Sequence, residues 1–104
     1  MAIVVTEQNF NDMLATGKPM MIDFSATWCG PCKALAPIVE ELANEYEGRV
    51  VIGKADVDEC PELSMRFGIR SVPTVIFFKD GKAVDKSIGA VPKNMLVEKI
   101  NSIL

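Results

Sequence analysis

Histidine is absent from this 104-residue sequence, and cysteine, tryptophan and tyrosine are scarce, with three, one and one residues. Without histidine the chain cannot form a Ser-His-Asp triad, a Cys-His nucleophile or a His-ligated metal centre. Three cysteines are too few, and odd in number, for the disulfide framework of a small secreted protein. Any catalysis must therefore depend on thiols, carboxylates, lysines or the backbone.

The sequence also lacks a long apolar run and a basic block. No apolar stretch is long enough to cross a bilayer, and residues 1–7 have neither the basic start nor the cleavage pattern of a secretion signal. The net charge is −3, with both signs interspersed, so no basic stripe is available to bind phosphates. We therefore expect a cytoplasmic protein with no membrane or nucleic-acid partner.

What is present is an ordinary globular mixture, 49% hydrophobic and 24% charged, which predicts a single domain over residues 1–104. Strand-like and helix-like patterns alternate along the chain. Strands are predicted at residues 2–6, 20–25, 50–56, 74–79 and 83–88, and helices at 9–15, from the cysteine pair to about 47, at 61–67 and at 92–103. This order predicts an α/β fold: a central mixed sheet, mostly parallel with one antiparallel hairpin, flanked by helices on both faces.

The strongest chemical signal is the pair Cys29 and Cys32, separated by Gly30 and Pro31 where a strand leads into a helix. Cysteines three positions apart can close a small disulfide ring. A helix N-terminus directs unpaired N–H groups at the first sulfur and favours its thiolate, which is the nucleophile. In the predicted mechanism, Cys29 attacks a substrate disulfide and Cys32 resolves the mixed disulfide, which leaves the pair oxidised.

Two other interpretations of the cysteine pair remain open. Cys-x-x-Cys is also half of a structural zinc site, but Cys60 is the only other soft ligand and four ligands are needed, so we expect no metal. The pair could also be two inert buried side chains.

Residues 23–33, which contain the cysteine pair, closely resemble the active-site signature of the thioredoxin family. The resemblance covers essentially the whole chain, through residues 36–37, 54–58, 68–74, 77–81 and 89–90. It implies a thioredoxin fold, protein-disulfide reductase activity and no bound cofactor beyond the redox-active disulfide Cys29–Cys32. It also implies disulfide-containing protein substrates and recycling by a thioredoxin-reductase-type flavoprotein that uses NADPH. We expect the protein to act as a monomer.

Asp23 stands within an apolar strand, where a buried carboxyl has a raised pKa. On pattern alone it could equally face a solvated edge. The resemblance implies that Asp23 helps to deprotonate Cys32 through water, and that Lys54 is the partner of Asp23. An ordinary surface lysine is the alternative for Lys54.

Pattern alone makes Pro73 a permitted proline at a strand start. The resemblance implies a cis-proline that faces the disulfide, with the Val72 backbone free to pair with an extended substrate. We expect an apolar patch around Cys29, called the docking patch below, made of Trp28, Gly30, Pro31, Val72, Pro73, Ile88, Gly89 and Ala90.

Two residues depart from the family pattern. Ser25 stands where many bacterial members have a second tryptophan, which makes Trp28 the only one in the chain. Cys60 precedes a short predicted helix, whose N-terminus favours a thiolate, so it is either a regulatory thiol or a simple helix-start residue.

Two other functions are compatible with the same sequence. An oxidase or isomerase shares the fold, and Gly30-Pro31 with Lys33 favours the reductase by resemblance. A binding subunit would use the docking patch as a clamp, independent of the redox state of the cysteines.

Overall fold

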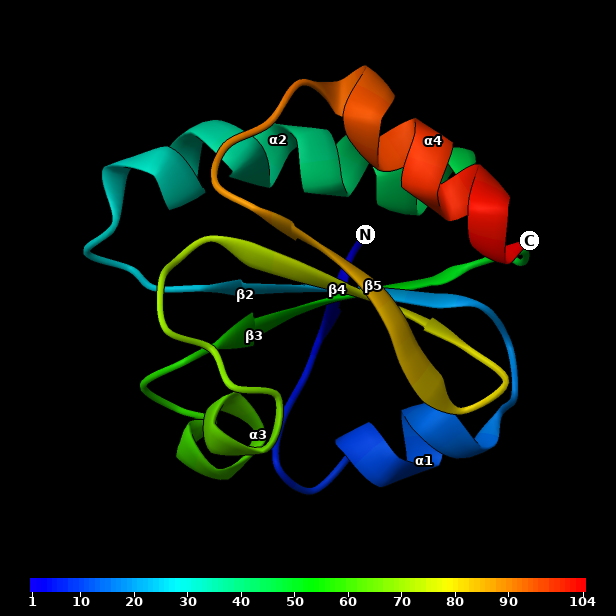
Figure 1. The fold of residues 1–104 in the computed structure, drawn as a ribbon, viewed down its shortest axis with the longest axis horizontal. Helices are drawn as coiled ribbons and strands as arrows, with labels where there is room; N and C mark the ends of the chain where they lie inside the picture. The colour runs from blue at the N-terminus through cyan, green and yellow to red at the C-terminus, as the bar shows by residue number, and fades with distance from the viewer.

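The computed structural model describes all 104 residues, and its strands form one five-stranded sheet in the order β1-β3-β2-β4-β5 (Figure 1). The strands are β1 (Ile3–Val4), β2 (Met20–Ser25), β3 (Val51–Asp56), β4 (Thr74–Lys79) and β5 (Lys82–Ile88). The helices are α1 (Phe10–Ala15), α2 (Gly30–Glu45), α3 (Pro61–Arg66) and α4 (Lys93–Ile103). The predicted order of strands and helices is confirmed, and so is the mixed sheet.

The predicted balance of strand directions was wrong. Strand β3 pairs in parallel with β1 and β2, whereas β4 is antiparallel to both β2 and β5, so half of the strand pairs are antiparallel. The six residues of α3 span about 9 Å, much less than the roughly 20 Å of a six-residue strand. The helix therefore does not return the chain to the other end of the sheet, and Thr74 enters beside Phe24, near the end of β2.

The helices cover both faces of the sheet, α2 and α4 on one side and α1 and α3 on the other (Figure 1). Fourteen buried residues form the core beneath α2 and α4, among them Met21, Ile52 and Val75 of the sheet. Eleven form the core beneath α1 and α3, where Phe10 packs edge-to-face against Phe67 and Phe78. Alternate side chains of the central strands thus serve opposite cores.

Local sequence explains the hairpin and the short first strand. Asp80 and Gly81 both have positive φ, 53° and 79°, as a type I′ turn between β4 and β5 requires. Strand β1 is shorter than predicted because only Ile3 and Val4 are paired, with Gly53 and Lys54, at the edge of the sheet.

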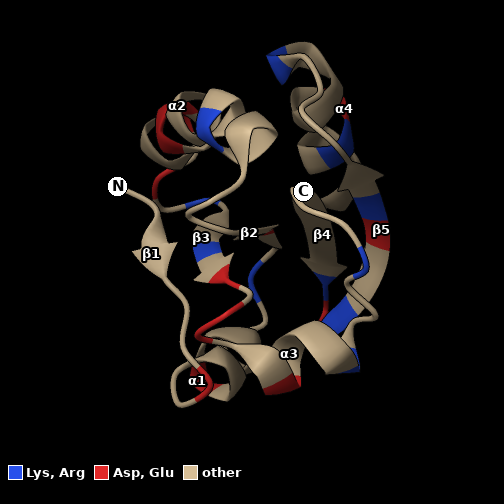
Figure 2. Ribbon diagram, turned by 90° about the vertical axis from the view of Figure 1, so that its left-hand side faces the viewer, with Lys and Arg blue, Asp and Glu red and all other residues tan.

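Charged residues of both signs are mixed over the surface, and acidic and basic segments follow one another along β5 (Figure 2). None of the four helices combines the length and the apolar character needed to span a bilayer.

Candidate active site

The two cysteines lie at the junction between β2 and α2, as the sequence predicts. Cys29 is the N-cap of α2, with extended backbone (φ −96°, ψ 117°), and Pro31 stands in the first turn, where a missing N–H is tolerated. The two form a disulfide with a Cα–Cα distance of 5.3 Å. The backbone N–H of Cys32 donates a hydrogen bond to Cys29 Sγ over 3.2 Å. This amide belongs to the first helical turn, where N–H groups have no backbone partner within the helix, and it points at the sulfur instead.

The disulfide packs in a small cluster of its own, apart from both main cores. This cluster contains Ala26, Cys29 and Cys32, with Val57 and Val72 at its margin. Cys29 has 5% of its surface exposed and Cys32 has 4%, so only a small part of Cys29 is accessible to a substrate.

Val72 and Pro73 lie next to the disulfide. Their peptide bond is cis, as the resemblance implies, and the Val72 carbonyl oxygen lies 3.7 Å from Cys29 Sγ. The N–H of Gly89 donates to the Pro73 carbonyl over 2.8 Å. This bond joins the loop before β4 to the loop after β5, and so brings two predicted parts of the docking patch together.

The residues of the predicted docking patch differ in exposure. Trp28 and Ile88 are 69% and 56% exposed, and Gly30, Pro31 and Ala90 are also exposed, whereas Val72 and Gly89 are half-buried. Pro73, the residue before β4, is buried.

The structure contains a groove beside Trp28 that the sequence pattern did not predict. It has a volume of about 360 Å³ and is lined by Trp28, Val57, Ile69, Arg70, Ser71 and Val72. The Trp28 indole N–H donates to Asp58 over 3.0 Å, and this bond fixes the ring at the groove edge. Residues 69–71 were part of the resemblance, but only the folded loop places them next to the tryptophan.

Asp23 is buried, with 3% of its surface exposed, and its Oδ1 has no hydrogen-bond partner. Burial raises the pKa of this carboxyl to about 6, and the positive charge of Lys54 partly opposes the rise. The sequence pattern alone did not decide between this buried location and a solvated edge. A carboxyl with such a pKa can exchange a proton near neutral pH.

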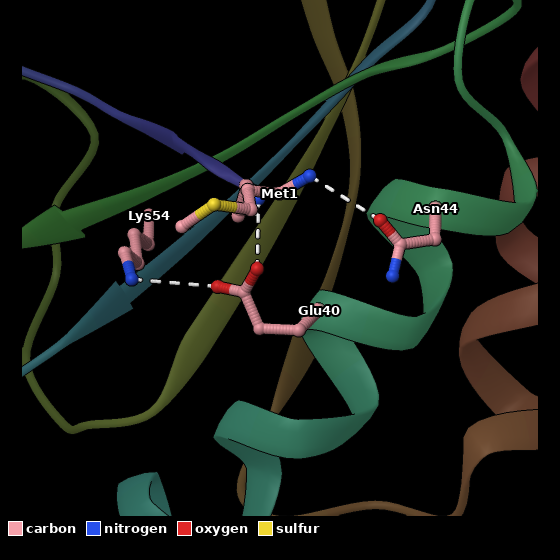
Figure 3. Close-up of polar contacts among 5 residues, drawn as sticks. Met1, Glu40, Asn44 and Lys54 are labelled. Atoms are coloured by element: carbon pink, nitrogen blue, oxygen red, sulfur yellow. Dashed lines mark hydrogen bonds and ion pairs between the residues drawn. The ribbon is translucent and has the colours of Figure 1, made fainter.

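Lys54 lies directly opposite Asp23 in the parallel register of β2 and β3. Its ammonium forms an ion pair with Glu40 of α2 at 3.3 Å (Figure 3). Lys54 forms no ion pair with Asp23. Lys54 therefore acts on Asp23 through its positive charge, which lowers the pKa of the carboxyl, and not through a direct ion pair. Glu40 was not predicted as a site residue, because it is one of several acidic residues on α2.

A cavity of about 280 Å³ opens between the start of α2 and the ends of β2 and β3. Cys32 and Lys54 both line this cavity. The other lining residues are Val4, Ser25, Ala26, Thr27, Lys33, Ala36 and Asp56. The cavity therefore gives water a place between the second cysteine and the charged end of β3.

The expectation of an acidic Cys60 was wrong. This cysteine is 1% exposed, and its thiol donates to the Val5 carbonyl over 3.4 Å. Burial raises the pKa of the Cys60 thiol, and the nearby Glu7, Asp56 and Glu59 raise it further. No group of three or more His, Cys, Asp and Glu side chains in the structure could hold a metal ion.

Comparisons with known proteins agree with this geometry. The thioredoxin family model matches residues 1–102. The chain is 51% identical to a thioredoxin of Staphylococcus saprophyticus over the full length of both chains. It is 47% identical to a thioredoxin of Chlorobaculum thiosulfatiphilum, over 92% of this chain and 90% of the relative, and 44% identical to the M-type chloroplastic thioredoxin of Pisum sativum, over 97% and 59%.

The matched residues include the strand–helix junction that carries the disulfide. The chain therefore belongs to the thioredoxin family, and Cys29 and Cys32 are the active-site pair of a protein-disulfide reductase that uses no bound cofactor.

Proposed function

We propose that Cys29 is the attacking nucleophile of this reductase and Cys32 the resolving thiol. The observation that carries the assignment is the Cys32 N–H directed at Cys29 Sγ, because an amide at a helix N-terminus stabilises negative charge on the sulfur that accepts it. The Cys29 thiolate attacks one sulfur of the substrate disulfide and displaces the other as a thiolate. Cys32 then attacks Cys29 Sγ, which releases the second substrate thiol and closes the Cys29–Cys32 disulfide.

In the second step Cys32 must lose a proton, and we propose that Asp23 accepts it through water. The support is its burial, its unpaired oxygen and a pKa raised to about 6 by that burial. Lys54 belongs to the same group because its charge adjusts the affinity of Asp23 for a proton.

Substrates dock, in this proposal, on the exposed part of the docking patch. An extended substrate segment pairs with the Val72 backbone beside Cys29, and Trp28 and Ile88 supply apolar contact on either side. The groove along residues 69–72 accommodates side chains of the same segment.

Membership of the family implies disulfide-containing substrates and a thioredoxin reductase that regenerates the dithiol. We propose that this reductase is a flavoprotein that uses NADPH. We further propose that residues 1–104 act as a single domain and a monomer in the cytoplasm, without nucleic-acid or membrane partners.

The test is the reduction of insulin disulfides by dithiothreitol. The native chain should accelerate precipitation of the reduced insulin, and Cys29→Ser should show only the rate of dithiothreitol alone. Cys60→Ser is the matched control, because it removes a thiol that is buried far from the reaction in another core cluster, and it should keep the native rate. Accelerated insulin reduction by Cys29→Ser would contradict the proposal.

A further inference from the structure

Two carboxylates lie within reach of one lysine beside the active site. Lys54 and Asp23 are register partners on adjacent strands, whose backbones are about 4.8 Å apart. Both side chains point toward α2, because Met21 and Ile52, two positions earlier on each strand, belong to the core beneath that helix. A lysine has a flexible four-carbon stem, so its ammonium could contact Asp23. In the structure it contacts Glu40 instead.

Glu40 is held in place from a second side. Its Oε1 accepts the backbone N–H of Ala2 over 2.9 Å, while its Oε2 accepts the Lys54 ammonium over 3.3 Å. Figure 3 shows the Glu40 side chain extending from α2 to both donors, with the Met1 ammonium bound to Asn44 one turn further along the helix. The Ala2 hydrogen bond is the largest cause of a lowered pKa of Glu40, so this carboxyl is ionised at neutral pH.

We propose that Glu40 is a positioning residue of the reductase: it holds the Lys54 ammonium near the surface and so prevents an ion pair between Lys54 and the buried Asp23. The Ala2 backbone fixes Glu40 for this task. The residue before β1, strand β3 and helix α2 thus combine to set the distance between Lys54 and Asp23. The catalytic meaning of this arrangement rests on the proposed role of Asp23 as proton acceptor.

The consequence is an Asp23 carboxyl that stays protonated up to a higher pH than an ion-paired one would. An opposite charge in direct contact favours the ionised form of a carboxyl, and it would pull the pKa of Asp23 down from about 6. Other charged groups near Lys54 are Lys33 of α2 and Asp56 of β3, which line the same cavity. The partner of Asp23 on β4 is the apolar Val75, so no charge approaches from that strand.

The experiment is a titration of the Asp23 side-chain carboxyl by ¹³C NMR in the oxidised protein, where neither active-site cysteine titrates. Glu40→Gln should lower the midpoint by about one pH unit, because Lys54 becomes free to pair with Asp23. Glu41→Gln is the matched control, because it removes the same charge from the next residue of α2, whose ion pair is with Lys93 at 3.1 Å. It should leave the midpoint unchanged.

A second pair of variants separates positioning from the charge of Glu40 itself. In a Lys54→Gln background no ammonium remains to move, so adding Glu40→Gln should not lower the Asp23 midpoint further. An equal fall with and without Lys54 would overturn the proposal, and so would a midpoint in Glu40→Gln that matches Glu41→Gln. If the midpoint falls as expected but the pH profile of insulin reduction does not move with it, the positioning stands and the proton-accepting role of Asp23 fails.

Discussion

The Cys32 amide and the Cys29 sulfur are joined by a 3.2 Å hydrogen bond across the first turn of α2. In the reduced protein this bond and the helix dipole favour the Cys29 thiolate. We predict that iodoacetamide alkylates Cys29 faster than a free peptide thiol at pH 7 and that Cys60 stays unmodified in the folded chain. Mass spectrometry of proteolytic fragments measures both rates. Reaction of Cys29 at the rate of the peptide would remove the basis of the nucleophile assignment.

Replacing the resolving thiol should stop the reaction halfway. Cys32→Ser leaves Cys29 able to attack but unable to transfer the bond, so a mixed disulfide with the substrate accumulates. A non-reducing gel of the variant with insulin should show this adduct, and dithiothreitol should release it. The double variant Cys29→Ser with Cys32→Ser is the control and should form none.

The buried Asp23 makes stability depend on pH. Its pKa is about 6 in the folded chain and 3.8 as the reference for the unfolded one, so the folded state binds the proton more tightly. Its stabilising contribution is therefore full below pH 4 and is lost as the pH rises through 6. Asp23→Asn removes this loss, and we expect it to raise the free energy of unfolding at pH 8 by about 3 kcal/mol at most, with little change at pH 4.

Urea unfolding of the oxidised proteins at both pH values measures this effect. Asp85→Asn is a control of opposite sign, because the hydrogen bond from Lys99 lowers the pKa of Asp85. It should not stabilise the chain at pH 8. Equal stabilisation by Asp23→Asn at pH 4 and pH 8 would show that the carboxyl is not titrating between them.

The docking patch can be tested with two aliphatic residues of β5 that are almost equally exposed. Ile88 is 56% exposed and lies within the patch, whereas Val84 is 54% exposed and lies outside it. Ile88→Asp places a charge where apolar substrate contact is proposed, and we expect kcat/KM for insulin to fall about tenfold, which corresponds to about 1.4 kcal/mol. Val84→Asp should keep the native value; equal losses in both would place the contact surface elsewhere.

Trp28 reports directly on the redox state because it is the only tryptophan and is next to Cys29. We predict that reduction of the disulfide changes its fluorescence emission. A Cys29→Ser protein, which has no such disulfide to reduce, should give the same spectrum before and after dithiothreitol. Identical spectra for the two states of the native chain would argue against the proximity of the ring to the reacting sulfurs.

Sequence patterns predicted the structure best where it is determined by interactions between residues close together in the chain. The bounds of β2 and β4 are those expected, because each is a largely apolar run, and the cysteine pair was placed correctly at a helix start. The direction of β4 was missed, because it depends on where α3 returns the chain. For Cys60 the helix-start argument failed because burial has the larger effect on its pKa.

Glu40 shows why the rest of the site could not be predicted. Glu40 and Glu41 are adjacent on α2, and nothing in the local sequence says which of them faces Lys54. The answer depends on the rotation of α2 over the sheet and on the register of β3 against β2, both of which are tertiary properties.

The separate packing of the disulfide has a consequence for repeated turnover. Ala26, Cys29 and Cys32 share no cluster with the fourteen or the eleven side chains that stabilise the two faces of the sheet. We therefore expect that opening and closing the sulfur–sulfur bond leaves both large sets of apolar contacts intact. The molecule can alternate between its two oxidation levels as a rigid carrier of two electrons, without dismantling its scaffold in either direction.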